Sequence, residues 1–204
     1  MKGVKRLIAI ALLILPLTAA AQFSQLDGTN GFMLKLEAGY MPYLTNVGTA
    51  DEFDFTIDSY HNATDLNILL GANISQDWFV GGGVGFMYLL PVGMKTAESF
   101  MGANVFADVD FRPIWKGVMG LDYQPMTIIW APEIGARLGG SILFNHPHYD
   151  TPFSPMFEVY AGINWYYAHG LRNMALNWHS FYATVGLAYM HQAFMAPIRI
   201  GWRW

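Results

Sequence analysis

Polar and apolar residues alternate in short segments along most of the chain from residue 31 onward. The last segment shows the pattern most clearly, because Ile198, Ile200, Trp202 and Trp204 fall on one face of an extended chain and Arg199 and Arg203 on the other. Such a strand suits a wall between lipid and a polar interior, whereas a soluble core would need a second layer to cover its apolar face.

Seven earlier segments show the same period of two, and turn-rich stretches separate them. We therefore expect an all-β fold, an eight-stranded antiparallel transmembrane up-and-down β-barrel. The expected strands are residues 31–43, 65–74, 78–89, 100–114, 127–142, 156–167, 178–190 and 197–204.

Composition supports a membrane-embedded barrel. Charged residues make up 13% of the chain and aromatic residues 16%, whereas soluble domains carry about 25% charge. Past residue 21 no apolar run approaches the roughly 18–20 residues that a membrane helix requires. A closed barrel is the other structure that pairs every backbone group within a membrane.

The first 21 residues have the features of a cleaved signal peptide. Lys2, Lys5 and Arg6 precede an apolar stretch, and small residues follow at 19–21. We expect residues 1–21 to be the signal and residues 22–204 the barrel, exported through the periplasm to the bacterial outer membrane. Without those three cations, eight basic residues face fifteen acidic ones, a net charge of −7, which argues against nucleic acid as a partner.

The inward faces of the expected strands carry five cations and five carboxylates. Buried charges are tolerated when they are paired, so we predict a packed network of ion pairs inside the barrel rather than a pore. An eight-stranded barrel is narrow enough for side chains to fill it. The predicted network comprises Lys35, Arg112, Arg137, Arg199 and Arg203 with Glu37, Asp108, Asp110, Glu133 and Glu158.

The signal peptide fixes the expected orientation, with short turns in the periplasm and residues 45–64, 90–98, 144–155 and 191–196 facing outward. The stretches at residues 115–126 and 168–177 are long for periplasmic turns, so a ten-stranded barrel that also uses residues 118–124 is an alternative. Outward aromatic residues near strand ends predict the two girdles of a membrane barrel. They are Trp78, Tyr88, Trp130, Trp165, Tyr189, Trp202 and Trp204.

Three segments, residues 77–86, 106–112 and 200–204, resemble small outer-membrane β-barrels of the OmpA-transmembrane and OmpX-like kind, especially the porin-family-like barrels of Bacteroidetes. The resemblance spans the mature chain and is one of pattern and composition. It implies that the barrel-insertion machinery recognises the closing strand through Ile198, Ile200, Trp202 and Trp204. Trp204 departs from the commoner terminal phenylalanine or tyrosine but keeps the aromatic character.

Candidate chemical sites are few. His146, His148 and Asp150 could share a metal ion, but no fourth ligand is evident. The acidic stretch at residues 51–58 lacks the spacing of a calcium loop. His179 and Ser180 are adjacent and so point to opposite faces, and no serine is placed with His61 and Asp65 or with His191.

We therefore expect no catalytic residues, no metal and no cofactor. The predicted function is structural or interactive: outer loops contact lipopolysaccharide or a protein partner, and the wall contacts outer-membrane lipids. A narrow porin-like channel is the alternative, and a barrel enzyme that modifies lipid A is a further one.

Overall fold

The structure, a computed structural model, describes residues 32–46, 61–75, 77–92, 99–113, 127–144, 153–168 and 180–204. The expected signal peptide at residues 1–21 lies outside these ranges. Within them, no helix is long and apolar enough to cross a membrane.

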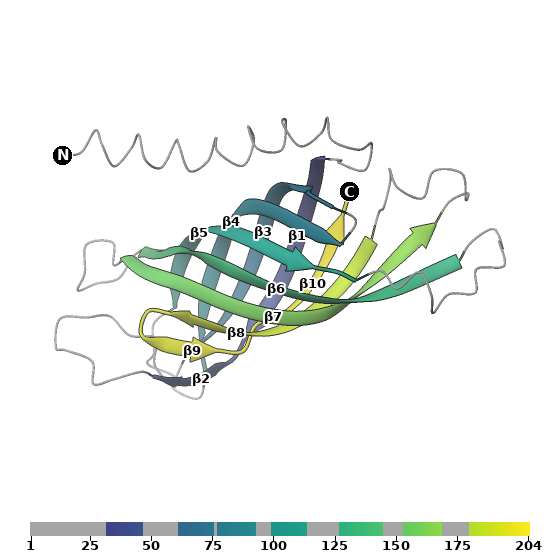
Figure 1. Cartoon of the computed structure of the whole chain (residues 1–204). Coiled ribbons are helices and arrows are strands. Elements are labelled where there is room, and N and C mark those ends of the chain that lie inside the picture. The colour runs from purple at the N-terminus through teal and green to yellow at the C-terminus, as the bar shows by residue number, and fades with distance from the viewer. Residues whose placement is uncertain are drawn as a thin grey trace, which may run out of the picture.

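Ten strands make a single sheet that closes on itself (Figure 1). They are β1 (Phe32–Met41), β2 (Tyr43–Asn46), β3 (His61–Asn73), β4 (Trp78–Pro91), β5 (Phe100–Phe111), β6 (Thr127–Phe144), β7 (Phe153–Ala168), β8 (Ser180–Met190), β9 (Ala193–Met195) and β10 (Ile198–Arg203).

These ten segments make up eight barrel strands, because β1 and β2 follow one another in one barrel strand and β9 and β10 in another. Pro42 separates β1 from β2, and Pro197 lies between β9 and β10, because proline has no N–H for the ladder between strands. The two interruptions lie side by side, since Ala196 N donates to Pro42 O at 2.9 Å. The chain is thus the predicted all-β, eight-stranded antiparallel up-and-down barrel.

The first and last strands close the barrel. β1 pairs with β10 from Lys35↔Arg203 to Tyr40↔Ile198, and β10 also pairs with β8. β5 pairs directly with β6 along eleven register positions. The ten-stranded alternative required an additional strand between β5 and β6, and this direct pairing leaves no place for one. Residues 118–124, which that alternative used, fall outside the described ranges.

Several loop boundaries predicted from the sequence were wrong. Residues 45–46 belong to β2, and β3 begins at His61 rather than at residue 65. β4 runs on to Pro91, and β7 begins at Phe153. In place of an outward loop at 191–196, a turn at His191 and Gln192 leads straight into β9. His61 is polar and therefore suggested a loop, but it points inward, and inside a barrel polar inward positions continue a strand.

The predicted alternation of inward and outward side chains is present in every barrel strand. In β1 the odd-numbered residues from Met33 to Glu37 are buried, while Phe32, Leu36 and Tyr40 are exposed. A slip of one residue would exchange the two faces, so this agreement also supports the register of the ladder.

Candidate functional site

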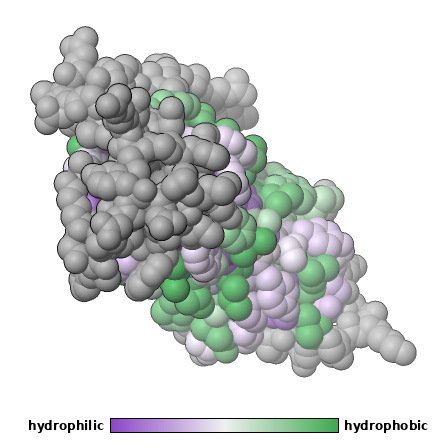
Figure 2. Space-filling view, turned by 90° about the vertical axis from the view of Figure 1, so that its right-hand side faces the viewer, coloured by the Kyte–Doolittle hydropathy of each residue, from purple (hydrophilic) through white to green (hydrophobic). Residues whose placement is uncertain are grey.

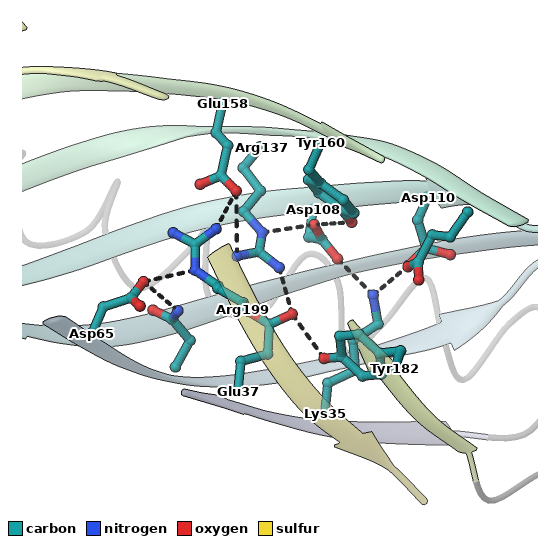
Figure 3. A network of polar contacts seen from close by, with 12 residues as sticks. Lys35, Glu37, Asp65, Asp108, Asp110, Arg137, Glu158, Tyr160, Tyr182 and Arg199 are labelled. Atoms are coloured by element: carbon teal, nitrogen blue, oxygen red, sulfur yellow. Dashed lines mark hydrogen bonds and ion pairs between the residues drawn. The ribbon is translucent and has the colours of Figure 1, made fainter. Parts of the chain in front are cut away.

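All ten residues of the predicted interior network point into the barrel, and each is at most 4% exposed. Figure 3 shows the part of this network around Lys35 and Arg137. The ten residues come from β1, β5, β6, β7 and β10, with Arg112 just beyond β5, and they lie near the middle and one end of the interior. This end carries the short β3–β4 turn; the opposite end, where β4–β5, β6–β7 and β8–β9 connect, is called the loop end below.

Arg137 on β6 lies among three carboxylates. Its Nη2 is 2.6 Å from Glu37 Oε1, its Nε is 3.0 Å from Asp108 Oδ1, and its Nη1 is 3.9 Å from Glu158 Oε1. Glu158 also pairs with Arg199, which the picture shows beside Arg137. The guanidinium thus joins β1, β5 and β7 across the interior.

Asp108 continues the network toward the turn end. Lys35 Nζ is 2.8 Å from Asp108 Oδ2 and also pairs with Asp110. Arg112 Nε is 2.7 Å from Asp110 Oδ1, and Arg203 Nη2 is 3.5 Å from Asp110 Oδ2. Arg203 further pairs with Glu133 on β6. Each of the ten predicted residues is therefore ion-paired with another of the ten.

One acidic residue of this network was missed. Asp65 on β3 accepts from Arg199 Nε and from Asn67 Nδ2, both at 2.8 Å. It is the first residue of the expected strand 65–74 and shares the parity of the inward Asn67, so alternation alone would have assigned it to the interior. With Asp65 included, these eleven residues are called the ionic layer.

Two tyrosines complete the coordination of the carboxylates. Tyr160 donates its hydroxyl to Asp108 Oδ1 at 2.9 Å, and Tyr182 donates to Glu37 Oε1 at 2.7 Å. A Cβ on Gly135 would lie 2.4 Å from the Tyr160 ring, and one on Gly201 2.3 Å from the Tyr182 ring. Glycine at these two inward positions therefore lets the rings lie flat against the wall.

The loop end of the interior holds a cluster of apolar side chains that was not predicted from the sequence. Met41, Met87, Met156, Met190 and Met195 are at most 2% exposed and belong to one cluster with Leu89, Phe100 and Leu143. These five methionines, here called the methionine layer, stand on β1, β4, β7, β8 and β9. Apolar residues at the inward positions nearest the loop end were the available sequence signal.

His191 lies at the rim of the methionine layer. Both His191 and Gln192 adopt positive φ, 48° and 58°, as a two-residue hairpin turn that matches the twist of the strands requires. The His191 amide donates to Ser154 Oγ at 2.6 Å, and its Nε2 lies 2.9 Å from Ser141 Oγ. Burial lowers the pKa of His191 from 6.5 to about 4, so the ring is neutral at pH 7.

Ser141 and His191 thus form the serine–histidine contact that the sequence did not reveal. Ser141 is fully buried and His191 is 2% exposed, so neither side chain reaches solvent. The contacts seat the turn against β6 and β7. Elsewhere, His61 packs on the Phe100 ring with centroids 5.5 Å apart, and Ser180 is buried toward the turn end of β8.

Within the described ranges, no group of three or more His, Asp or Glu side chains is arranged to hold a metal ion. The weighed candidates at residues 51–58 and 146–150, and His179, lie outside those ranges.

The outer wall is apolar, and none of the described Lys or Arg side chains points outward. On the part of the face in Figure 2 that grey atoms do not cover, green side chains are interspersed with mostly pale purple ones. Ile198 and Ile200 are each 53% exposed, Trp204 is exposed and Trp202 is half-buried. The four residues of the predicted insertion signal therefore share the outer face of the closing strand.

Aromatic side chains gather at two levels of this wall. Near the turn end, Trp165, Phe181, Trp202 and Trp204 form a chain of ring contacts 5.8–6.5 Å between centroids. Trp78 packs on Phe111 at 4.9 Å in the same region. Near the loop end, Tyr189 meets Phe194 edge-on at 5.5 Å. The side chain of Trp130 lies outside the described set.

No protein-family model matches the chain, and a search of the curated proteins finds no match either. Among solved structures, Neisserial surface protein A matches with 15% identity and a TM-score of 0.51, covering 85% of this chain and 97% of that one. The N-terminal β-barrel domain of Pseudomonas aeruginosa OprF covers 84% and 97% at 12% identity, with a TM-score of 0.37. Ail, the attachment invasion locus protein of Yersinia pestis, covers 86% and 97% at 13% identity, also with 0.37. Together with the closed sheet, the likeness to Neisserial surface protein A shows that this chain has the fold of the small eight-stranded outer-membrane β-barrels.

Proposed function

We propose that the protein is a closed outer-membrane β-barrel with a structural or interactive function, whose outward connections contact lipopolysaccharide or a protein partner. The observation that carries this proposal is the separation of charge: every described cation lies inside the barrel, and the outer wall is apolar between two aromatic levels. A soluble protein does not require that arrangement, whereas a barrel in a membrane does.

The spacing of the aromatic levels fits an outer membrane. Phe181 and Tyr189 are eight residues apart on β8, and Trp78 and Tyr88 ten residues apart on β4. At about 3.3 Å per residue and a strand tilt of roughly 40°, these intervals span about 20–25 Å, close to the roughly 25 Å apolar band of such barrels.

A filled interior supports the closed barrel over the porin-like alternative. The side chains of the ionic and methionine layers are at most 4% exposed. The lipid A-modifying alternative needs a nucleophile that lipid can reach, and among the described residues the hydroxyl that contacts His191, that of Ser141, is buried. We propose no catalytic residue, cofactor or metal for this protein.

The negative charge of the outward connections limits which chemical groups they can bind. The connections between β2 and β3, β4 and β5, and β6 and β7 contain six acidic residues and only Lys95 as a cation: Asp51, Glu52, Asp54, Asp58, Glu98 and Asp150. Phosphate groups of lipopolysaccharide would therefore be bound through bridging divalent cations, which carboxylates coordinate well. A protein partner would present a basic surface.

The test compares the full-length protein with a variant in which a short Gly-Ser linker replaces residues 47–60. Unboiled samples of both should migrate faster than boiled ones in detergent electrophoresis, with a β circular dichroism spectrum, because the barrel is intact. Only the full-length protein should bind lipopolysaccharide aggregates in Mg²⁺, and EDTA should release it.

The outcomes separate the parts of the proposal. If boiling changes no mobility, the closed barrel itself is refuted. If the full-length protein shifts but neither binds lipopolysaccharide nor cross-links to a neighbour in cells, the interactive function is wrong. Stepwise conductance in a planar bilayer would instead favour the porin-like alternative.

A further inference from the structure

The interior of the barrel divides into two chemically different layers along its axis. On β1, Met41 stands four residues beyond Glu37, toward the loop end; on β7, Met156 precedes Glu158 in the same direction. The layers meet where Arg199 Nη2 donates to Met41 Sδ at 3.5 Å. Any solute that enters from the loop end must cross the methionine layer before it reaches the ionic layer.

The ionic layer retains unused hydrogen-bonding capacity. Among the described residues, Glu37 Oε2, Asp65 Oδ1 and Glu158 Oε2 are buried and accept no hydrogen bond, and Arg137 Nη1 donates none. Buried polar atoms of this kind are normally satisfied by internal water. These four atoms belong to neighbours around Arg137 and Arg199, so they mark one region of internal hydration.

The methionine layer offers water much less. Its side chains are thioethers and hydrocarbons, and the serine hydroxyls at its rim, Ser141 and Ser154, are bound to His191. A hydrated ion that enters an apolar constriction loses its shell without replacement. Methionine suits such a constriction because its flexible, unbranched side chain fills irregular gaps.

We propose that the methionine layer is an apolar seal, which separates a hydrated ionic layer from water and solutes at the loop end. The inference rests on the proposed closed barrel and adds to it where the closure lies. The ion pairs then hold the barrel strands together, and the methionines exclude water that would enter from the loop end.

The chain contains no cysteine, so a single introduced thiol can report access to the ionic layer. Thr184 on β8 is buried, faces inward and pairs in register with Arg199 on β10. Thr184→Cys is close to isosteric and places the thiol at the level of the ionic layer. The measurement is the rate at which a small cationic methanethiosulfonate reagent modifies this thiol in the folded barrel, followed by mass spectrometry.

Two double variants in the Thr184→Cys background test the seal. Met87→Ser with Met156→Ser shortens and polarises the layer on two strands that are not neighbours, β4 and β7, and should raise the modification rate at least about tenfold. Met87→Leu with Met156→Leu keeps volume and apolarity, and should leave the rate unchanged. Each preparation is first checked for the mobility shift on boiling; if the double serine variant fails it, Met156→Ser alone takes its place.

Each result has a distinct meaning. Slow modification in the parent and the leucine variant with fast modification in the serine variant supports the seal. Slow modification in all three overturns the seal but leaves the closed barrel intact. Fast modification in the Thr184→Cys parent means that the interior is already open, which refutes the closed barrel of the proposed function.

Discussion

Arg137 shows how a single buried residue can determine the stability of this barrel. It is 2% exposed and pairs with Glu37, Asp108 and Glu158, while its guanidinium also lies 5.0 Å from the rings of Phe106 and Tyr160. A buried ion pair is not in itself strong evidence for stability, but removing one partner leaves the others uncompensated.

Arg137→Ala should destabilise the barrel by about 3–5 kcal/mol, because three carboxylates lose a shared cation. Leu138→Ala is the matched control: Leu138 is the next residue on β6, and it faces lipid at 67% exposure. Denaturant unfolding in the same detergent measures both. Equal midpoints for Arg137→Ala and the unmutated protein would refute a stabilising network.

His191 makes stability depend on pH. Burial lowers its pKa in the folded protein to about 4, from 6.5, so between these values the unfolded chain binds a proton that the folded one does not. The free energy of unfolding should therefore fall as the pH drops from about 6.5 to about 4, by up to about 3 kcal/mol from this group.

His191→Asn isolates this contribution, because asparagine tolerates the left-handed backbone and does not titrate. Unfolding midpoints at pH 7, 6, 5 and 4 should diverge between the unmutated protein and the variant only as the pH falls. Parallel curves would mean that His191 is not held neutral by burial.

At the scale of the element, β10 carries both the closure and the predicted insertion signal. Arg199 and Arg203 enter the ionic layer while Ile198 and Ile200 face outward. Trp204 follows the strand, and its backbone N–H and C=O pair with Leu34 on β1 at 3.0 and 3.2 Å. The last residue therefore still belongs to the seam between the first and last strands.

Trp204→Ala should lower the amount of heat-modifiable barrel in outer-membrane fractions of expressing cells, whereas Trp204→Phe should preserve it, because the proposed insertion signal requires an aromatic ring. Refolding of purified Trp204→Ala into detergent serves as the control. If it refolds normally yet accumulates normally in membranes as well, Trp204 is not part of such a signal.

At the scale of the whole molecule, the barrel is asymmetric along its axis. Charged side chains and tyrosine hydroxyls lie in the middle and toward the turn end, whereas the methionine layer lies at the loop end, with Ser141, Ser154 and His191 at its rim. The long strands β6 and β7 form the most extended part of the wall (Figure 1). Ion pairing and the proposed exclusion of water thus belong to different residues of one interior.

The sequence alone was sufficient to predict the eight barrel strands and which residues of each point inward or outward. A period of two is a local property, and lipid outside with charge inside makes every inward position distinguishable from its neighbours. That is why Lys35, Arg137 and Arg203 could be assigned to the interior from parity. Strand ends were less predictable, because a residue such as His61 is polar whether it continues a strand or belongs to a loop.

Tertiary structure decided what parity cannot specify. The partners of Arg137 stand on β1, β5 and β7, and Ser141 meets His191 from fifty residues away. Such contacts depend on the stagger in register between neighbouring strands, which fixes the height of each inward residue along the barrel axis. The same stagger gathers five methionines from five strands into one layer. Alternation assigns a residue to a face, and only the closed sheet assigns it a neighbour.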